Sequence, residues 1–259
     1  MLNPMYSDME LTALYPPDYY AYQDRFRVRE WREITKRLLG YHVGTREPEF
    51  EAPGAILDLG CGSGWFLDKA RDRGWKTYGV EVSEQAALLG HKSRNLQIFH
   101  GTLQDARFPA EFFDYVRSNH SFEHISCPNE TLDEIHRILK PQGKLLICVP
   151  NVSSLSARVF RQYWWHLCAP VHAFNYSRGT LGRMLDKHGF HVKKVSFNSD
   201  YCGIIGSLQI WSNRNNGRSS MEGMLVNNYL LRFLCQCASN LLDLSGQGDM
   251  IEITAVKDH

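Results

Sequence analysis

The chain has 259 residues, of which 43% are hydrophobic and 22% are charged, a composition typical of a globular protein with one large core. Its formal net charge of +1 excludes a global electrostatic attraction to nucleic acid, and we predict no nucleic-acid partner. The sequence shows neither a cationic leader before an apolar run nor about eighteen consecutive apolar residues, so we expect a cytoplasmic protein without a spanning helix.

The N-terminal region is distinct from the rest of the chain. Residues 1–23 are rich in Tyr and Pro, and residues 24–40 place apolar side chains at helical spacing before Gly40. We therefore predict a cap segment with a helix over residues 1–50, followed by a main domain over residues 51–259. The tyrosines of this cap either line an acceptor pocket or seal the core beneath the cap helix; they are Tyr15, Tyr19, Tyr20 and Tyr22.

The main domain begins with a regular alternation of strand and helix patterns. Apolar strand patterns are AILDL, KTYGVEV, NLQIFH, FFDYVRS, GKLLICVP, FHVKKVSF and DMIEITAVK. Helical patterns separate most of them, which predicts right-handed crossovers between parallel strands. We expect an α/β, Rossmann-like, doubly wound sheet of seven strands, mostly parallel, with an antiparallel last strand. Ligands of such sheets bind at the carboxyl ends of the strands.

An insertion interrupts the alternation before the last strand, over residues of about 199–248. It contains the strongly apolar helical pattern MEGMLVNNYLLRFLCQCASNLLDLSG. This helix can pack on the sheet, form a dimer seam or rest on a membrane surface. Because the net charge is near zero and the helix has no cationic face, we favour packing or a homodimer over membrane contact.

A glycine-rich turn follows the first strand of the main domain. Gly60, Gly62 and Gly64 alternate between Asp58 and a helix, and Glu81 ends the next strand, where it can accept hydrogen bonds from both hydroxyls of a ribose. The alternative is a turn used only for packing. A dinucleotide site prefers G-x-G-x-x-G, and Asp58 would repel a diphosphate. An amine and a sulfonium suit this site better, which is the profile of S-adenosylmethionine.

Four motifs extend this interpretation over residues 55–149. They are ILDLGCGSG, YGVEVS, FDYVRSNHSFEHI and LDEIHRILKPQGKLLICVPN. With them the chain resembles the class I S-adenosylmethionine-dependent methyltransferases. It is most similar to the branch that methylates small metabolites, quinone precursors and glycan-related acceptors, in which a Glu-His pair follows the fourth strand.

The resemblance implies a role for each matching residue of the cofactor site. The turn residues are expected to hold the amino-acid moiety: Gly60, Cys61, Gly62 and Gly64. Asp58 is expected to act on the ammonium group through water or amides, Glu81 on the ribose, and Val82 on adenine. The backbone of Leu103 is expected to recognise the ring, while Thr102 stands where many relatives carry an acid, so Thr102 or Asp105 is left to accept from the adenine amino group. Asn119 and His120 are expected to border the methionine arm and the methyl group.

Methyl transfer to a hydroxyl needs a group that removes a proton, and a histidine suits this role. The candidates are His172, His120 and His166, with His172 first because the resembling branch often has a histidine after a proline in this loop. For each, the alternative is a hydrogen-bonded packing residue. His124 is expected to tie the loop after the fourth strand to nearby backbone.

We predict no metal site. Asp133, Glu134 and His136 have helical spacing, but they interleave with the apolar stripe of the same helix and form its solvated face. The seven cysteines are odd in number and several lie in apolar segments, which favours buried reduced thiols over a disulfide framework. They include no CxxC pair, so we expect no structural zinc site.

These patterns together predict an S-adenosylmethionine-dependent methyltransferase that acts on a small-molecule or glycan-like acceptor, with oxygen preferred as the methylated atom. Two alternatives remain open. One is a non-catalytic cofactor-binding or membrane-proximal scaffold subunit, and the other is an NAD-dependent oxidoreductase.

Overall fold

The structure is a computed structural model, and it describes residues 53–214 and 223–258. The predicted cap over residues 1–50, its helix and its four tyrosines lie outside these residues. The fold below therefore concerns the main domain.

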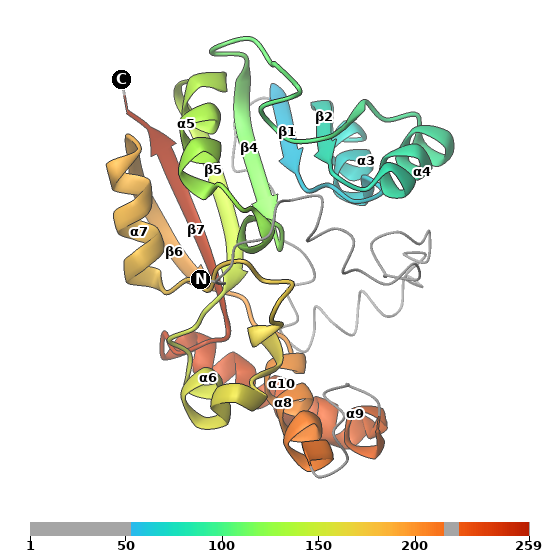
Figure 1. Ribbon diagram of the computed structural model, residues 1–259, viewed down its shortest axis with the longest axis vertical. Coiled ribbons are helices and arrows are strands. Elements are labelled where there is room, and N and C mark those ends of the chain that lie inside the picture. The colour runs from blue at the N-terminus through green and yellow to red at the C-terminus, as the bar shows by residue number, and fades with distance from the viewer. Residues whose placement is uncertain (1–52, 215–222, 259) are drawn as a thin grey trace.

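One seven-stranded sheet forms the centre of the domain (Figure 1). Its strands are β1 Ala55–Leu59, β2 Lys76–Glu81, β3 Ile98–His100, β4 Phe113–Asn119, β5 Leu139–Pro150, β6 Phe190–Phe197 and β7 Met250–Lys257. Their order is β3-β2-β1-β4-β5-β7-β6, and β7 is antiparallel to both of its neighbours while the other paired strands are parallel. The predicted doubly wound, mostly parallel sheet with an antiparallel last strand is confirmed.

Helices connect the strands and divide into two groups. The first group comprises the helices of the strand-helix alternation, α3 Trp65–Arg71, α4 Glu84–Arg94, α5 Pro128–Ile138 and α7 Arg178–Lys187. A second group comprises α6 Leu155–Phe160, α8 Cys202–Asn213, α9 Met224–Asn227 and α10 Tyr229–Leu244. Figure 1 shows this second group beyond the ends to which the arrows of β1 and β4 point. It therefore lies at the carboxyl ends of the parallel strands, where ligands of this fold bind.

Three short 3-10 helices complete the connections within the part of the chain that the structure describes. They are η2 Phe122–His124 after β4, and η3 Arg161–Tyr163 and η4 Trp165–Leu167 after α6. All three belong to the segments that follow β4 and β5. They bring the predicted catalytic histidines to the same end of the sheet.

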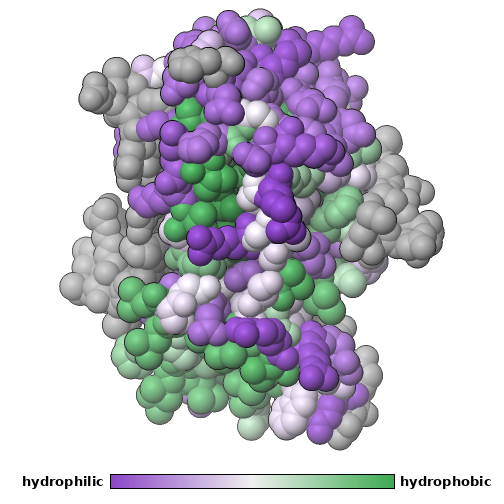
Figure 2. Space-filling view, turned by 90° about the vertical axis from the view of Figure 1, so that its left-hand side faces the viewer, coloured by the Kyte–Doolittle hydropathy of each residue, from purple (hydrophilic) through white to green (hydrophobic). Residues whose placement is uncertain are grey.

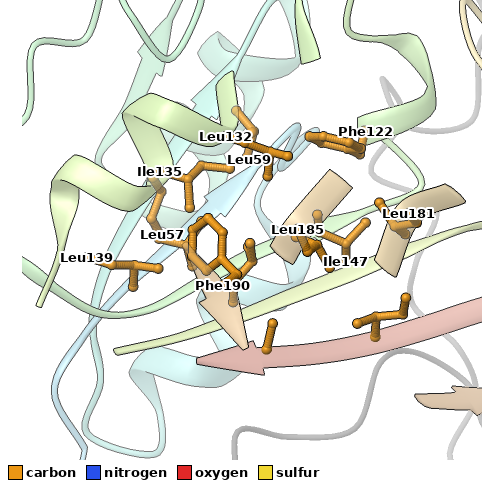
Figure 3. Packing of buried hydrophobic residues seen from close by; sticks show 14 of the residues in the cluster. Leu57, Leu59, Phe122, Leu132, Ile135, Leu139, Ile147, Leu181, Leu185 and Phe190 are labelled. Atoms are coloured by element: carbon orange, nitrogen blue, oxygen red, sulfur yellow. The ribbon is translucent and has the colours of Figure 1, made fainter. Parts of the chain in front are cut away.

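The main core lies between the sheet and helices α5 and α7. Leu132, Ile135 and Ile138 of α5 are fully buried, as the stripe in its sequence predicts. They pack with strand residues such as Leu57 and Ile147 and with Leu181 and Leu185 of α7 (Figure 3). Each such side chain contributes about 1.5 to 3 kcal/mol through burial.

Hydroxyl caps set where several helices begin. Ser83 accepts a hydrogen bond from the backbone N–H of Ala86 and opens α4, as its sequence predicts. Ser177 and Thr180 form a reciprocal capping box at the start of α7. Because α4 follows β2 directly, the cap of Ser83 also fixes the backbone beside Glu81.

The segment between β6 and β7 is helical, and one of its faces is exposed. Cys235, Gln236 and Ser239 of α10 are buried. Side chains on other sides of α10 are exposed, including Tyr229, Leu230, Leu234, Leu241 and Leu244. Figure 2 shows hydrophobic surface gathered in the lower part of the molecule, where Figure 1 places α6, α8 and α10. Within the described ranges, no helix has both the length and the hydrophobicity needed to cross a membrane.

Candidate cofactor and acceptor site

The backbone of the turn after β1 lies close to strand β2 and to the loop after β4. The backbone N–H groups of Gly60 and Cys61 donate to the carbonyl of Val80 in β2, at 2.8 and 3.2 Å. Gly60 has a φ of +73°, and a Cβ added there would lie 2.3 Å from the Cβ of Ser121. Only glycine fits this position, because a side chain would be strained by the backbone conformation and would displace the loop after β4.

Glu81 lies at the carboxyl end of β2, directly beside this turn. Its Oε2 accepts from the backbone N–H of Gly62 at 2.8 Å, and its Oε1 accepts from that of Ser83 at 2.9 Å. Burial raises the pKa of this carboxyl group, and the two N–H donors act in the opposite direction. Each carboxylate oxygen keeps a second lone pair, so the group is oriented and still able to accept from two ligand hydroxyls.

Asp58 is paired inside the fold. Its Oδ1 accepts from Nη1 of Arg117 in β4 at 2.6 Å, and the two residues are only 2% and 7% exposed. The guanidinium also lies 4.0 Å from the centre of the Phe66 ring. Arg117 therefore offsets the negative charge of Asp58, which weakens the argument that Asp58 alone would repel a diphosphate. Any action of Asp58 on the cofactor ammonium group remains a prediction.

Arg117, Ser118 and Ser121 are site residues that sequence reasoning missed. The hydroxyl of Ser121 donates to the carbonyl of Leu59 at 2.6 Å, and the hydroxyls of Ser118 and Ser121 are 2.6 Å apart. These contacts tie the loop after β4 to the glycine turn after β1. The signal for Arg117 was its positive charge in the strand pattern FFDYVRS, at the position opposite the acidic residue of the neighbouring strand.

The predicted adenine contacts lie in the loops after β2 and β3. Val82 is 40% exposed directly after Glu81, whereas the side chain of Leu103 is buried at 2% exposure. Thr102 donates its hydroxyl proton to Oδ2 of Asp105 at 2.6 Å, and its backbone N–H points to the same oxygen at 3.3 Å. Asp105 thus supplies a carboxylate beside Thr102, and the hydrogen bonds from Thr102 lower its pKa.

The side chain and the backbone of Cys61 have different surroundings. A Cβ added to Gly79 of β2 would lie 2.6 Å from the Cys61 sulfur, so the thiol occupies the space that this glycine leaves. Burial raises the pKa of the thiol, and the carboxylates of Glu81 and Asp58 add to the effect. Cys61 can therefore face a ligand through its backbone, while its sulfur belongs to the packing between β1 and β2.

The three predicted catalytic histidines come together at the ends of β4 and β5. His120 directly follows β4, with its N–H bonded to the carbonyl of Cys148 at 2.9 Å and a φ of +54°. Asn119 is the last residue of β4. The side chain of His120 is 43% exposed, which makes it the accessible member of the group.

His172 and His166 are held more tightly. Nδ1 of His172 donates to the carbonyl of His166 at 2.9 Å, and His172 is 9% exposed. Desolvation, reinforced by neighbouring histidines, lowers the pKa of His172 to about 3 and that of His120 to about 4. Both rings are therefore neutral near pH 7, and each is a weaker base than a free imidazole. Nε2 of His166 is buried and has no hydrogen-bond partner among the described residues.

Glu123 and His124 complete this group, which we call the histidine cluster: His120, Glu123, His124, His166 and His172. Nδ1 of His124 donates to the carbonyl of Val171 at 3.0 Å, which confirms that it ties the loop to neighbouring backbone. The rings of His124 and His172 meet edge to face, with centres 4.7 Å apart. Glu123 is 1% exposed, and burial raises its pKa to about 8.

The expected helix face of α5 is separate from this cluster. Asp133 bonds Nδ1 of His188 at 2.6 Å, and Glu134 pairs with Arg137 at 2.7 Å, both on the outside of the domain. The ring of His136 packs edge to face on Phe190. These three residues make surface contacts within the domain, as the pattern of α5 suggests.

Trp164 is a buried residue of the segment after β5. It is 3% exposed, and its Nε1 donates to Oδ1 of Asp249 at 3.0 Å. The same oxygen accepts from the hydroxyl of Ser154 at 2.6 Å. Asp249, directly before β7, therefore joins the segment after β5 to the last strand. Tyr163 and Trp165 are partly exposed aromatic residues of this segment.

Comparison with known proteins identifies the family. A family profile described as a methyltransferase domain matches residues 22–195. Demethylmenaquinone methyltransferase of Listeria welshimeri is 27% identical over 148 residues, 52% of this chain and 58% of that protein. The corresponding protein of Geobacillus kaustophilus is 27% identical over 170 residues, 62% of this chain and 65% of its own length. The chain thus matches less than two thirds of the length of these curated relatives.

Solved structures share the fold. A complex between the Haloferax volcanii Trm112 methyltransferase activator and a methyltransferase contains a chain with a TM-score of 0.60 and 20% identity, over 87% of this chain and 89% of that one. An S-adenosylmethionine-dependent methyltransferase of Archaeoglobus fulgidus has a TM-score of 0.56 and 21% identity, over 88% and 94%. The expected fold and the expected class of S-adenosylmethionine-dependent methyltransferases are confirmed. The chain belongs to the methyltransferase-domain family.

Proposed function

We propose that the chain binds S-adenosylmethionine at the carboxyl ends of β1 and β2 and transfers its methyl group to a small-molecule or glycan-like acceptor, at oxygen. The observation that carries the proposal is the buried Glu81 carboxylate, held by the N–H groups of Gly62 and Ser83 beside the glycine turn. Two oriented acceptor oxygens suit the two hydroxyls of a ribose. The turn fits the amino-acid end of the same ligand, because Gly60 leaves backbone there without a side chain.

Each residue around this site has a proposed role that follows from its position. Gly60, Cys61, Gly62 and Gly64 would hold the amino-acid moiety, Glu81 the ribose, and Val82 with the Thr102–Asp105 pair the adenine. Asn119 and His120 would border the methyl group. When bound, S-adenosylmethionine supplies a methyl carbon on a sulfonium, which is already activated toward displacement, so the protein contributes alignment, exclusion of water and proton removal.

We assign proton removal to His120 in preference to His172. The ring of His120 is 43% exposed at the end of β4, so an acceptor hydroxyl can reach it. His172 was the first candidate from its place after Pro170, but it is buried and its Nδ1 is already bonded to the His166 carbonyl. In this proposal His172 and His166 position the loop, and His120 accepts the proton of the acceptor hydroxyl.

The nature of the acceptor rests on the surroundings of His120 and on the relatives. The names of the Listeria and Geobacillus relatives state that they methylate demethylmenaquinone, a quinone. The partly exposed Tyr163 and Trp165 offer aromatic surface in the segment after β5, and such surface stacks on rings and sugar faces. Both features support a ring-bearing acceptor.

Cofactor binding tests the first half of the proposal. Glu81→Ala removes both acceptor oxygens, and we expect S-adenosylhomocysteine to bind about 1.5 to 3 kcal/mol more weakly by isothermal titration calorimetry, through loss of charge-assisted hydrogen bonds. Glu84→Ala is the matched control, since Glu84 is an exposed acid in the first turn of α4. Equal affinity in Glu81→Ala and the control would remove the ribose role. Stabilisation by NADH without stabilisation by S-adenosylhomocysteine would favour an oxidoreductase.

Turnover tests the second half. The full chain is incubated with methyl-labelled S-adenosylmethionine and either a cell extract or a panel of hydroxylated quinols and sugars, and label transfer is measured. We expect His120→Ala to lower the rate of transfer by about 100-fold or more while the affinity for S-adenosylhomocysteine changes little. Tight cofactor binding without labelling of any acceptor would favour a non-catalytic subunit.

A further inference from the structure

Three side chains of the histidine cluster converge from two segments that are distant in sequence. Glu123 and His124 belong to η2, after β4, while His172 lies between η4 and α7. One ligand atom from each lies within 4.8 Å of the other two. A carboxylate and two imidazoles are a frequent ligand set for divalent transition metals, and here all three come from the carboxyl end of the sheet.

Glu123 is the member whose contacts are incomplete. It is 1% exposed, and its Oε2 has no hydrogen-bond partner in the part of the chain that the structure describes. Its Oε1 is 3.8 Å from Nδ1 of His120, which is beyond hydrogen-bond distance. A buried carboxylate in this condition needs either a proton or a cation close to it.

The two histidines are oriented as metal ligands commonly are. Nδ1 of His124 bonds the carbonyl of Val171, and Nδ1 of His172 bonds the carbonyl of His166. A carbonyl only accepts, so both Nδ1 atoms carry the proton and both lone pairs are on Nε2. Metal-bound histidines usually donate their other ring nitrogen to a carbonyl or carboxylate in this way, which fixes the tautomer and the ring plane.

We propose that Glu123, His124 and His172 bind one divalent first-row transition-metal ion, with zinc as the representative. Imidazole ligands favour zinc, iron, cobalt or nickel over magnesium and calcium, which prefer oxygen alone. Ligand atoms about 2.1 Å from zinc lie about 3.4 Å apart in a tetrahedron. One ligand atom of each of the three residues already lies within 4.8 Å of the other two, so small side-chain shifts bring them to this spacing. The sequence predicts no metal site, and this proposal departs from that prediction.

The place of the site in the fold also assigns the ion a task, and this step rests on the proposed function. Three protein ligands leave an open position on the metal. The exposed ring of His120 lies next to this site, with its Nδ1 3.8 Å from Oε1 of Glu123. A metal ion there orients an acceptor hydroxyl and makes it a stronger acid, and His120 receives the proton.

Metal binding by the full chain tests the site without any assay of activity. The protein, free of purification tags, is stripped with a chelator and titrated with Co²⁺ and Zn²⁺ by calorimetry and visible absorption. We expect one ion per chain, a cobalt spectrum with nitrogen ligands, and a loss of affinity of about 100-fold or more in Glu123→Gln and in His172→Ala. His191→Ala is the control, because His191 is an exposed histidine of β6.

Two outcomes overturn the proposal. One is a wild-type chain that takes up no stoichiometric cobalt or zinc, which would mean that Glu123 is protonated and hydrogen-bonded within the cluster. The other is uptake that Glu123→Gln and His172→Ala leave unchanged, with the variants shown to be folded by their unfolding transitions. S-adenosylhomocysteine binding is measured on the same samples, so that a failure of the metal site is distinguished from a failure of the cofactor site.

Discussion

The two halves of the site are held together in different ways. At the cofactor end, the turn after β1 bonds the adjacent strand β2, and a buried ion pair between Asp58 and Arg117 links two neighbouring strands. At the acceptor end, Asp249, directly before β7, accepts hydrogen bonds from Trp164 and Ser154, which are 85 and 95 residues away in sequence. The buried Asp58 is paired with a full charge. The buried Asp249 is bonded by two neutral donors at Oδ1, and its Oδ2 has no hydrogen-bond partner among the described residues.

This difference indicates which end of the site can change in sequence. The contacts of the cofactor end are made by backbone and by residues at fixed places in adjacent parallel strands, so they serve any acceptor. The contacts of the acceptor end join the segment after β5 to the insertion and to β7, and they change when those loops change. We infer that cofactor chemistry is set by the sheet, while acceptor choice is set by the packing of its additions.

The largest expected effect comes from breaking the charge pair of the cofactor end. Arg117→Met removes the partner of a carboxylate that is 2% exposed, and we expect a loss of about 3 to 5 kcal/mol in the free energy of unfolding. Burial already raises the pKa of Asp58, and Arg117 opposes this shift. A carboxyl group with a raised pKa stabilises the fold at low pH and loses that contribution as the pH rises through the folded-state value.

Denaturant unfolding at two pH values checks both parts of this prediction. The difference between Arg117→Met and wild type should be larger at about pH 8 than at about pH 5, where protonation relieves the buried charge. The control is Asp58→Asn combined with Arg117→Met, which should recover part of the loss because no unpaired carboxylate remains. A loss that is equal at both pH values would contradict the charge as its cause.

Local patterns predict the cofactor end well and the acceptor end poorly, for physical reasons. Gly60 and Glu81 are set by a turn and a strand end, whose geometry follows from the residues beside them. Arg117 was visible as a charge in a buried strand, but its partner depended on the strand register. Glu123 and His172 come from different loops, and no periodicity connects two loops that meet only in the folded chain. Their convergence, and the burial of Trp164, are properties of the packed structure.

A smaller effect is expected at the aspartate of the acceptor end. Asp249→Ala leaves the indole N–H of Trp164 and the hydroxyl of Ser154 without their acceptor, which costs about 2 kcal/mol of unfolding free energy. Asp249→Asn keeps an amide oxygen for both donors and should lose less. We expect S-adenosylhomocysteine affinity to stay near that of wild type in both. A loss of stability larger than that of Arg117→Met would reverse the ranking of the two ends.

The smallest expected effect lies on the exposed face of α10, and it separates packing from assembly. Leu241 is 68% exposed, so Leu241→Ser should change the free energy of unfolding by no more than about 0.5 kcal/mol if this face meets solvent. Ile205→Val is the comparison within the same insertion, because Ile205 is fully buried and should lose about 1 kcal/mol. If the predicted homodimer uses this face, wild-type stability rises with protein concentration and Leu241→Ser abolishes that dependence. Stability that is independent of concentration in both proteins would contradict the homodimer.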